Sequence, residues 1–400
     1  MSVDAIAWLG YALVVAAAFV RSRAFGVFAA IVLVFPTAIG NALRGEFGPL
    51  GTAVLYLQLA TDVHFTGLLL RPALRPLWFR ALVSVPGLWF AAACLLAWPW
   101  ALVSAFAGGA AGAWIPFVLC LLGLWQSLVT RREHVHIVLD RQDVAGVQPR
   151  RHRAGVQRTS ASAPAPARAG RPLRIVQITD PHLGPFMSVA RLRAICSRAV
   201  AAEPDLVLVT GDLMTMESQQ LEVVAGALAP LSALPGRVFA CHGNHDHEAR
   251  AVVARAYARC GITLLVDEAV RVQTDAGPVQ LVGADFVWRR RAEHLAQLAA
   301  AHPREPDALR LWLLHDPGAF RHVPAGDADL VLSGHTHGGQ VGLVSLGHHG
   351  TFLSLVSSIP DHGLWARGRD RLYVHRANGH YGFPIRLGVP AEESVLHVWR

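Results

Sequence analysis

Five short polar motifs in the second half of this 400-residue chain each follow directly after a short apolar run. They are Asp180-Pro181-His182, Gly211-Asp212, Gly243-Asn244-His245-Asp246, His315-Asp316 and Gly334-His335-Thr336-His337. The apolar runs do not alternate with polar residues, which is typical of strands buried on both faces of a sheet. Ligand sites in such sheets lie at the carboxyl ends of the strands. The pattern therefore predicts an α/β fold with one shared site at the strand ends.

The expected order of elements in this half of the chain is strand, helix, strand. Continuous apolar runs predict strands at residues 175–178, 206–209, 238–240, 279–282, 311–314 and 330–332. Helix-forming residues at helical spacing predict helices at residues 189–201, 221–231, 249–259 and 292–300. Because helices that alternate with buried strands pack onto the sheet, we expect a sheet covered on its faces.

The side chains in the five motifs are of the kinds that bind divalent cations. Carboxylates and imidazoles from several strand ends can converge on one place only if a cation offsets them. Two divalent ions about 3.5–4 Å apart would lower the pKa of a shared water and offset the charge of a phosphoryl group. The residues therefore predict phosphate-ester hydrolysis, and Mn, Fe and Zn suit the oxygen and nitrogen ligands equally. The candidate ligands are Asp180, His182, Asp212, Asn244, His315, His335 and His337.

From about residue 172 to the C-terminus, the motifs resemble the signature of the calcineurin-like metallophosphoesterases. That signature runs Asp-x-His, Gly-Asp, Gly-Asn-His-Asp/Glu, His and Gly-His-x-His, and all five blocks are present in this order. The stretch from Gly334 to Gln340 and the ending Pro384-Ile385-Arg386-Leu387-Gly388 are similar to the membrane-linked branch of the family. The resemblance implies a four-layer α-β-β-α sandwich.

The resemblance also implies a role for each motif residue. Asp180, His182 and His337 would bind the first metal, and Asn244, His315 and His335 the second. Asp212 would bridge the two ions. His245 would act as an outer-shell acid toward a phosphoryl or leaving-group oxygen. Asp246 would orient the ring of His245 and favour its protonated form.

Some residues depart from the family pattern or lie near the motifs without a predicted role. Asp316 stands where Asn is commoner and is expected to face solvent, whereas Arg376 and His380 could touch the substrate. Cys241 is expected to be a packing residue. The remaining nearby histidines are interpreted as spectators: His242, His247, His348, His349 and His362.

The first third of the chain is apolar enough to span a membrane several times. Nearly uncharged segments predict up to five membrane helices, at residues 3–20, 24–43, 50–70, 81–106 and 110–129. Arginines follow the first, third and fifth segments, so the positive-inside rule places the N-terminus outside and the large domain in the cytoplasm. That orientation reverses if any one segment does not span.

Three regions are therefore expected: a transmembrane helical region at residues 1–130, a linker at 131–171 and a phosphoesterase domain at 172–400. Within the linker, residues 134–139 are predicted to form a short strand, and residues 140–171, rich in Arg, Pro, Ala and Ser, are predicted to be a mobile, partly extended tether. The positive charge is concentrated between Arg131 and Arg174, with ten arginines and three acids. A cluster beside a membrane span favours an anionic lipid surface over nucleic acid, and a solvated linker without a ligand is an equal alternative.

These features predict a multi-pass membrane protein that hydrolyses phosphodiester, pyrophosphate or phosphomonoester bonds through a hydroxide activated by two metal ions. A lipid-linked phosphate is a candidate substrate because of the membrane segments alone. The alternative is a non-catalytic membrane sensor that binds a phosphorylated ligand, and a third hypothesis is a transporter regulated by the phosphatase domain. The complete ligand set argues against the sensor. Oligomeric state is left open by the sequence.

Overall fold

The computed structural model describes residues 3–140, 142–160, 170–380, 382–383 and 385–400, and the chain divides into two compact units. The first unit contains Met1–Leu128 and Gly382–Leu387, and the second contains Val129–Tyr381 and Gly388–Arg400. Each unit has its own hydrophobic core.

The described N-terminal part of the first unit consists of helices and the short segments that connect them. Its elements are α1 (Val3–Arg21), α2 (Arg23–Leu43), η1 (Arg44–Leu50), α3 (Gly51–Leu70), α4 (Leu77–Phe79), η2 (Arg80–Ser84), α5 (Val85–Ala107) and α6 (Ile115–Ser127). Two stretches are long and apolar enough to cross a bilayer, Phe25–Leu70 and Leu77–Ala107. Each of the five predicted segments is largely helical, and their number as spans stays a prediction.

A short segment from the end of the chain also belongs to the helical unit. Ile385 packs into the core of this unit, and the backbone N–H of Arg386 donates to the carbonyl of Gly123 at 3.0 Å. The chain therefore returns to the helical unit before it forms its last strand.

The second unit contains two seven-stranded sheets. The first has the order β3 (Val156–Ser160), β1 (Thr130–Val138), β14 (Ala391–Trp399), β4 (Leu173–Ile178), β5 (Leu206–Thr210), β6 (Val238–Cys241) and β7 (Thr263–Leu264). The second has the order β2 (Arg150–Arg151), β12 (Gly363–Arg367), β13 (Asp370–Val374), β11 (Leu330–Ser333), β10 (Leu309–Leu313), β9 (Gly277–Gly283) and β8 (Glu268–Thr274). The central strands β4 to β7 and β9 to β11 pair in parallel.

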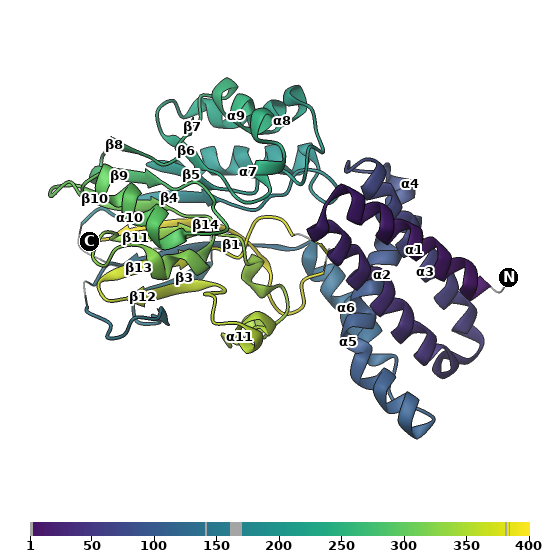
Figure 1. Ribbon diagram of the computed structural model, residues 1–400. Coiled ribbons are helices and arrows are strands. Elements are labelled where there is room, and N and C mark those ends of the chain that lie inside the picture. The colour runs from purple at the N-terminus through teal and green to yellow at the C-terminus, as the bar shows by residue number, and fades with distance from the viewer. Residues whose placement is uncertain (1–2, 141, 161–169, 381, 384) are drawn as a thin grey trace. The chain divides into compact units, whose positions relative to one another are not determined.

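The helices cover the outer faces of the two sheets, which gives four layers. Figure 1 shows α7 (Val189–Ala201), α8 (Leu221–Leu228) and α9 (Arg250–Arg259) together beside the first sheet, whereas α10 (Arg291–Ala301) and η5 (Pro317–His322) pack on the second. The shorter helices are η3 (Ala229–Ala233), η4 (Asp246–Glu248), η6 (His337–Gly339), η7 (Val344–Leu346) and α11 (Phe352–Val356). The predicted α-β-β-α sandwich is confirmed.

The side chains of one strand show why the strand sequences do not alternate. In β5, Val207 and Val209 pack with the helices, whereas Leu206 and Leu208 pack between the two sheets. Both faces of each central strand are therefore buried in apolar surroundings, as in other covered parallel sheets.

The linker region contains more regular structure than the tether predicted for residues 140–171. A strand was expected at 134–139, and β1 extends over Thr130–Val138, with Val135 and Ile137 buried between the sheets. β2 and β3 also lie in this region and join the edges of the two sheets. Arg151 of β2 pairs with Asp361, and Arg158 of β3 pairs with Glu133. Ion pairs therefore hold these edge strands although their residues are too polar to form a core. The Ser/Ala/Pro-rich centre at 161–169 is outside the described residues.

Candidate metal centre

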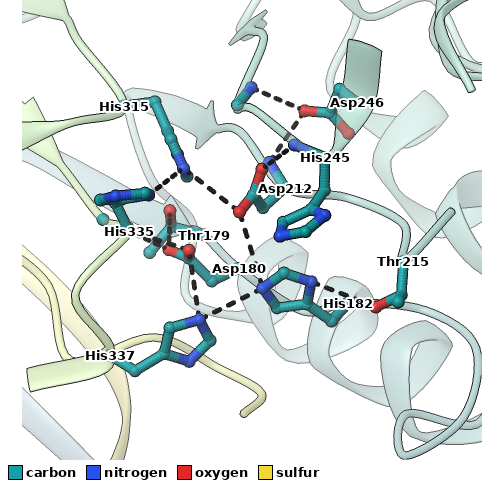
Figure 2. Close-up of polar contacts among 12 residues, drawn as sticks. Thr179, Asp180, His182, Asp212, Thr215, His245, Asp246, His315, His335 and His337 are labelled. Atoms are coloured by element: carbon teal, nitrogen blue, oxygen red, sulfur yellow. Dashed lines mark hydrogen bonds and ion pairs between the residues drawn. The ribbon is translucent and has the colours of Figure 1, made fainter. Parts of the chain in front are cut away.

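All seven candidate ligands lie just beyond the carboxyl ends of five strands, and both sheets contribute. Asp180 and His182 follow β4, Asp212 follows β5 and Asn244 follows β6. His315 follows β10 of the second sheet, and His335 and His337 follow β11. Figure 2 shows the carboxylates and imidazoles of this set turned toward one another.

Five of these residues adopt a left-handed backbone conformation that side chains other than glycine avoid. The conformation costs about 1–2 kcal/mol per residue. Such strain persists where the surrounding structure enforces it, and it concentrates at functional sites. The residues are Asp180, His182, Asp212, His335 and His337, with φ angles of 48°, 49°, 53°, 68° and 51°.

The first cluster contains Asp180, His182 and His337. The Nε2 atoms of the two imidazoles are 3.2 Å apart, and Nε2 of His337 is 3.5 Å from Oδ1 of Asp180. All three side chains are buried. Three potential ligand atoms therefore face one another away from bulk water, which is the arrangement that a cation would stabilise.

The second cluster contains Asp212, His315 and His335. Nε2 of His315 is 3.2 Å from Oδ2 of Asp212 and 3.2 Å from Nδ1 of His335. Nδ1 of His315 lies 2.8 Å from the carbonyl oxygen of Thr210. We place a ring proton on Nδ1, where it donates to this carbonyl, and Nε2 faces the cluster. A backbone contact of this kind fixes the ring of metal-binding histidines.

Asp212 connects the two clusters. Its Oδ2 atom is 3.2 Å from His315 in the second cluster and 3.6 Å from His182 in the first. Its Oδ1 atom accepts a hydrogen bond of 2.9 Å from the backbone N–H of His245. The carboxylate is therefore placed to contact ions in both clusters.

Asn244 completes the predicted ligand set. Its Oδ1 atom is buried and has no hydrogen-bond partner among the described residues. A buried carbonyl oxygen without a partner loses the free energy of one hydrogen bond unless a cation or water satisfies it. Together with the oxygen and nitrogen donors of both clusters, this atom fits a site for divalent cations.

Burial and the neighbouring charges shift the pKa values of the candidate ligands in different directions. Burial raises the pKa of Asp212, but the imidazoles of His315, His245 and His182 outweigh it and hold that pKa well below its ordinary value. Burial lowers the pKa of His182 to about 3. Burial also lowers the pKa of His315, but the carboxylates of Asp212 and Asp180 outweigh it and raise that pKa to about 10. A cation binding at His315 would therefore displace a proton.

Two glycines permit this close packing. A Cβ atom on Gly334 would lie 2.1 Å from Oδ2 of Asp180 and 2.1 Å from Oγ1 of Thr179. A Cβ atom on Gly243 would lie 2.2 Å from Oδ1 of Asp212. Both positions require the absence of a side chain because the backbone approaches a ligand carboxylate.

The surroundings of His245 correct the role expected for Asp246. The carboxylate beside the ring of His245 is Glu248, with 3.0 Å between Nδ1 and Oε1. Asp246 instead accepts backbone N–H groups from Asp212, Leu213 and Gly243 at 2.8, 2.9 and 2.8 Å. It therefore joins the loops after β5 and β6, because a buried carboxylate needs several donors.

The surroundings of other residues near the motifs can be compared with their predicted roles. Asp316 is buried and pairs with Arg291 at 2.7 Å, so the expectation that it faces solvent is wrong. Cys241 is buried, consistent with a packing role. His380 is buried beside Phe186, and Arg376 pairs with the carboxylates of Glu392 and Glu133.

Sequence reasoning missed residues that hold the loops from a distance. Asp285, at the end of β9, lies 3.0 Å from His242 and 3.0 Å from His247, on either side of the Gly-Asn-His-Asp motif. The side-chain oxygen of Asn378 accepts the backbone N–H of Thr179 at 2.8 Å. No local motif marks Asp285 or Asn378, because their partners lie far away in sequence.

Comparison with known proteins supports the same chemistry. The family described as calcineurin-like phosphoesterase matches residues 173–339. A protein of Escherichia coli named phosphodiesterase YaeI is 28% identical over 233 residues, which cover 57% of this chain and 82% of that protein. An uncharacterized metallophosphoesterase of Helicobacter pylori is 29% identical over 233 residues, covering 56% of this chain and 60% of that protein.

A membrane protein is also among the relatives. A Danio rerio protein named transmembrane protein with metallophosphoesterase domain is 28% identical over 232 residues, covering 55% of this chain and 52% of that protein. The present chain thus spans about half to four-fifths of the length of these three relatives. It contains a calcineurin-like metallophosphoesterase domain, and such a domain is a phosphoester hydrolase.

Proposed function

We propose that this protein is a membrane-anchored phosphodiesterase that holds two divalent cations at the ends of its central strands. Asp180, His182 and His337 would hold one ion, and Asn244, His315 and His335 the other. Asp212 would contact both. The observation that carries the proposal is the position of Asp212 Oδ2, which is 3.6 Å from His182 in one cluster and 3.2 Å from His315 in the other.

When bound, the cations would lower the pKa of the attacking water and offset negative charge on the phosphoryl oxygens. The ligand residues fit Mn, Fe and Zn alike, because histidine and carboxylate bind all three. Elemental analysis of the purified protein would therefore identify which metal is bound.

His245 is proposed to donate a proton to the leaving-group oxygen. Burial lowers the pKa of its imidazole, but the hydrogen bond to Glu248 and the charge of Asp212 outweigh it, so the pKa is raised. The ring lies beside that of His182, with 5.3 Å between their centroids. With Nδ1 directed at Glu248, the proton for the leaving group would come from Nε2.

Asp246 is proposed to position the catalytic loops without touching the substrate. Its three backbone hydrogen bonds hold Asp212 and the start of the Gly-Asn-His-Asp motif at a fixed separation. Such contacts keep ligands within the narrow range of positions that catalysis requires.

The helical unit is proposed to anchor the enzyme as a multi-pass membrane segment. Support comes from the two long apolar stretches and from the apolar helices α1 and α6 on either side of them. The arginines after the first, third and fifth segments favour a cytoplasmic phosphoesterase unit. Proteolysis of right-side-out and inverted vesicles would test this. The unit should be cut only in inverted vesicles, and cleavage only in right-side-out vesicles would reverse the topology.

The proposed substrates are phosphodiesters first, with pyrophosphates and monoesters as further candidates. The similarity to the Escherichia coli relative named phosphodiesterase YaeI supports a diester. Anchoring in a membrane would also give access to lipid-linked phosphates.

Turnover of bis(4-nitrophenyl) phosphate by the full chain tests the proposal. Asp212→Asn should abolish metal-dependent turnover while leaving the unfolding temperature close to that of the wild type. Asp275→Asn is a matched control, because this carboxylate is 78% exposed in the turn between β8 and β9. Equal turnover by wild type and Asp212→Asn would refute the mechanism.

A further inference from the structure

A cavity lined by arginines lies in the phosphoesterase unit, apart from the metal ligands. Its volume is about 340 Å³, which falls within the range of about 300–1,000 Å³ that small-molecule sites occupy. Five arginines contribute to its lining: Arg131, Arg151, Arg153, Arg158 and Arg376. They come from β1, β2, β3, the turn between β2 and β3, and the segment after β13. We refer to it as the arginine cavity.

Three of these arginines are held in place by acids, of which Asp361 and Glu392 are buried and Glu133 is partly buried. Arg151 pairs with Asp361, and Arg158 pairs with Glu133. Arg376 lies 2.9 Å from a Glu133 oxygen and 3.0 Å from an oxygen of Glu392, which also lies 3.3 Å from Arg158. The guanidinium groups therefore have fixed positions before any ligand arrives, which lowers the entropy cost of binding.

The other two arginines have no such partner. Arg131 and Arg153 are exposed, and no carboxylate of the described residues lies within ion-pair distance of either. Five arginines thus face three carboxylates, Glu133, Asp361 and Glu392. The excess of positive charge is available to a ligand from outside, and it creates a local field that attracts anions.

The pKa values of two histidines in the cavity are lowered in part by the charge of its arginines. Burial, together with the charges of Arg151, Arg376 and Arg158, lowers the pKa of His362 to about 3 against the opposing charge of Asp361. Burial and the charges of Arg151 and Arg153 also lower the pKa of His349. Both histidines line the cavity.

The arginine cavity is connected to the metal centre through the Gly-His-Thr-His loop. Thr336, which lies between His335 and His337, donates its hydroxyl to the carbonyl of Asp361 at 2.6 Å. Arg151 binds the carboxylate of the same Asp361. Arg376 packs so closely on Gly338 that a Cβ atom there would lie 3.0 Å from its Cγ. One layer of residues therefore borders both the cavity and the metal centre.

We propose that the arginine cavity binds a phosphate-bearing group of the substrate other than the phosphate that is hydrolysed. This inference rests on the proposed phosphodiesterase function and extends it to the substrate class. Arginine binds phosphate oxygens through paired, charge-assisted N–H donors, and several preset guanidiniums suit a dianionic group. The chemistry is shared by a phospholipid head group and a soluble phosphorylated ligand. Arg131, three residues after Leu128 in sequence, directly follows the helical unit.

Binding of inorganic pyrophosphate to the metal-free full chain tests the cavity separately from catalysis. The chain would be stripped with a chelator, placed in nanodiscs of phosphatidylcholine and titrated by calorimetry. We expect Arg131→Gln/Arg153→Gln to weaken binding at least about tenfold, because the variant loses charge-assisted hydrogen bonds to the phosphate oxygens. Arg255→Gln, an exposed arginine on α9, is the matched control and should bind like the wild type.

A second set of nanodiscs containing phosphatidic acid distinguishes the two sources of phosphate. If the wild type binds pyrophosphate more weakly in these discs than in phosphatidylcholine discs, and Arg131→Gln/Arg153→Gln does not, the result would support a lipid head group as the ligand. Unchanged binding would support a soluble ligand. Equal affinity of the wild type and Arg131→Gln/Arg153→Gln, or no binding to the wild type in phosphatidylcholine, would overturn the proposal. Absence of bis(4-nitrophenyl) phosphate turnover by the metal-loaded wild type would instead refute the phosphodiesterase function.

Discussion

Replacing Gly334 by Ala would add one methyl group at the tightest contact of the metal centre. The added Cβ atom would lie 2.1 Å from both Oδ2 of Asp180 and Oγ1 of Thr179. The φ angle of Gly334 is not in the left-handed region, so alanine would fit the backbone itself. The substitution therefore tests the crowding at Asp180 and Thr179 without adding backbone strain at residue 334.

The structure gives the size of the effect. An ordinary carbon–oxygen contact exceeds 3 Å, so the carboxylate of Asp180 must move by about 1 Å or more. It accepts two contacts from the N–H of His335, at 3.0 and 2.9 Å, and one from Thr179 at 2.7 Å. Overpacking of this kind costs about 1–3 kcal/mol of stability, and a misplacement of about 1 Å lowers turnover about 100-fold.

The assay is metal content together with metal-dependent turnover of bis(4-nitrophenyl) phosphate. Gly334→Ala should lose about 100-fold in turnover and bind less metal. Gly226→Ala is the matched control, because a Cβ atom in α8 would have no heavy atom within 4 Å. It should keep full activity and gain about 0.5–1 kcal/mol of stability. Wild-type metal content and turnover in Gly334→Ala would refute the packing argument.

Two further substitutions test the surroundings of the site. Glu248→Gln should lower the pKa of His245, because the substitution removes the carboxylate that raises it. The alkaline limb of the pH–rate profile should then move to lower pH with the metal content unchanged. The control is Glu222→Gln at an exposed position on α8, which should leave the profile as it is. Glu392→Gln should cost about 3–5 kcal/mol near neutral pH in thermal unfolding, because it breaks a buried ion pair network. Burial raises the pKa of Glu392, but Arg158, His375 and Arg376 outweigh it and hold it well below its ordinary 4.5. Its stabilisation is therefore complete above pH 4.5 and lost as pH falls through the folded pKa, and a constant stability difference in acid would contradict this.

The central strands and the positions of the candidate ligands could be read from the sequence because the relevant signals are local. The residues of β5 are buried on both faces of the strand, and Asp212 lies two residues after the end of β5. Parallel strands with their carboxyl ends at one edge then bring their following residues together without further information. This is why the five motifs predicted a shared site.

The edge strands and the supporting residues could not be predicted in the same way. A strand at β1 was expected from its own residues, but β14 was not, and neither was the parallel pairing of β1 with β14, which lies more than 200 residues later. The Arg-rich strand β3 is held by ion pairs of Arg158 rather than by apolar packing. The partner of His245 was misassigned because three residues in the tight η4 turn bring Glu248 to the ring, whereas Asp246 turns toward the backbone.

Elemental analysis of the purified full chain, paired with its activity, tests the central claim most directly. The account predicts two divalent metal ions per chain in the active wild type. It predicts a lower metal content and no turnover in Asp212→Asn, since this carboxylate contacts both clusters. A wild-type protein that hydrolyses bis(4-nitrophenyl) phosphate at full rate without bound metal would contradict the account.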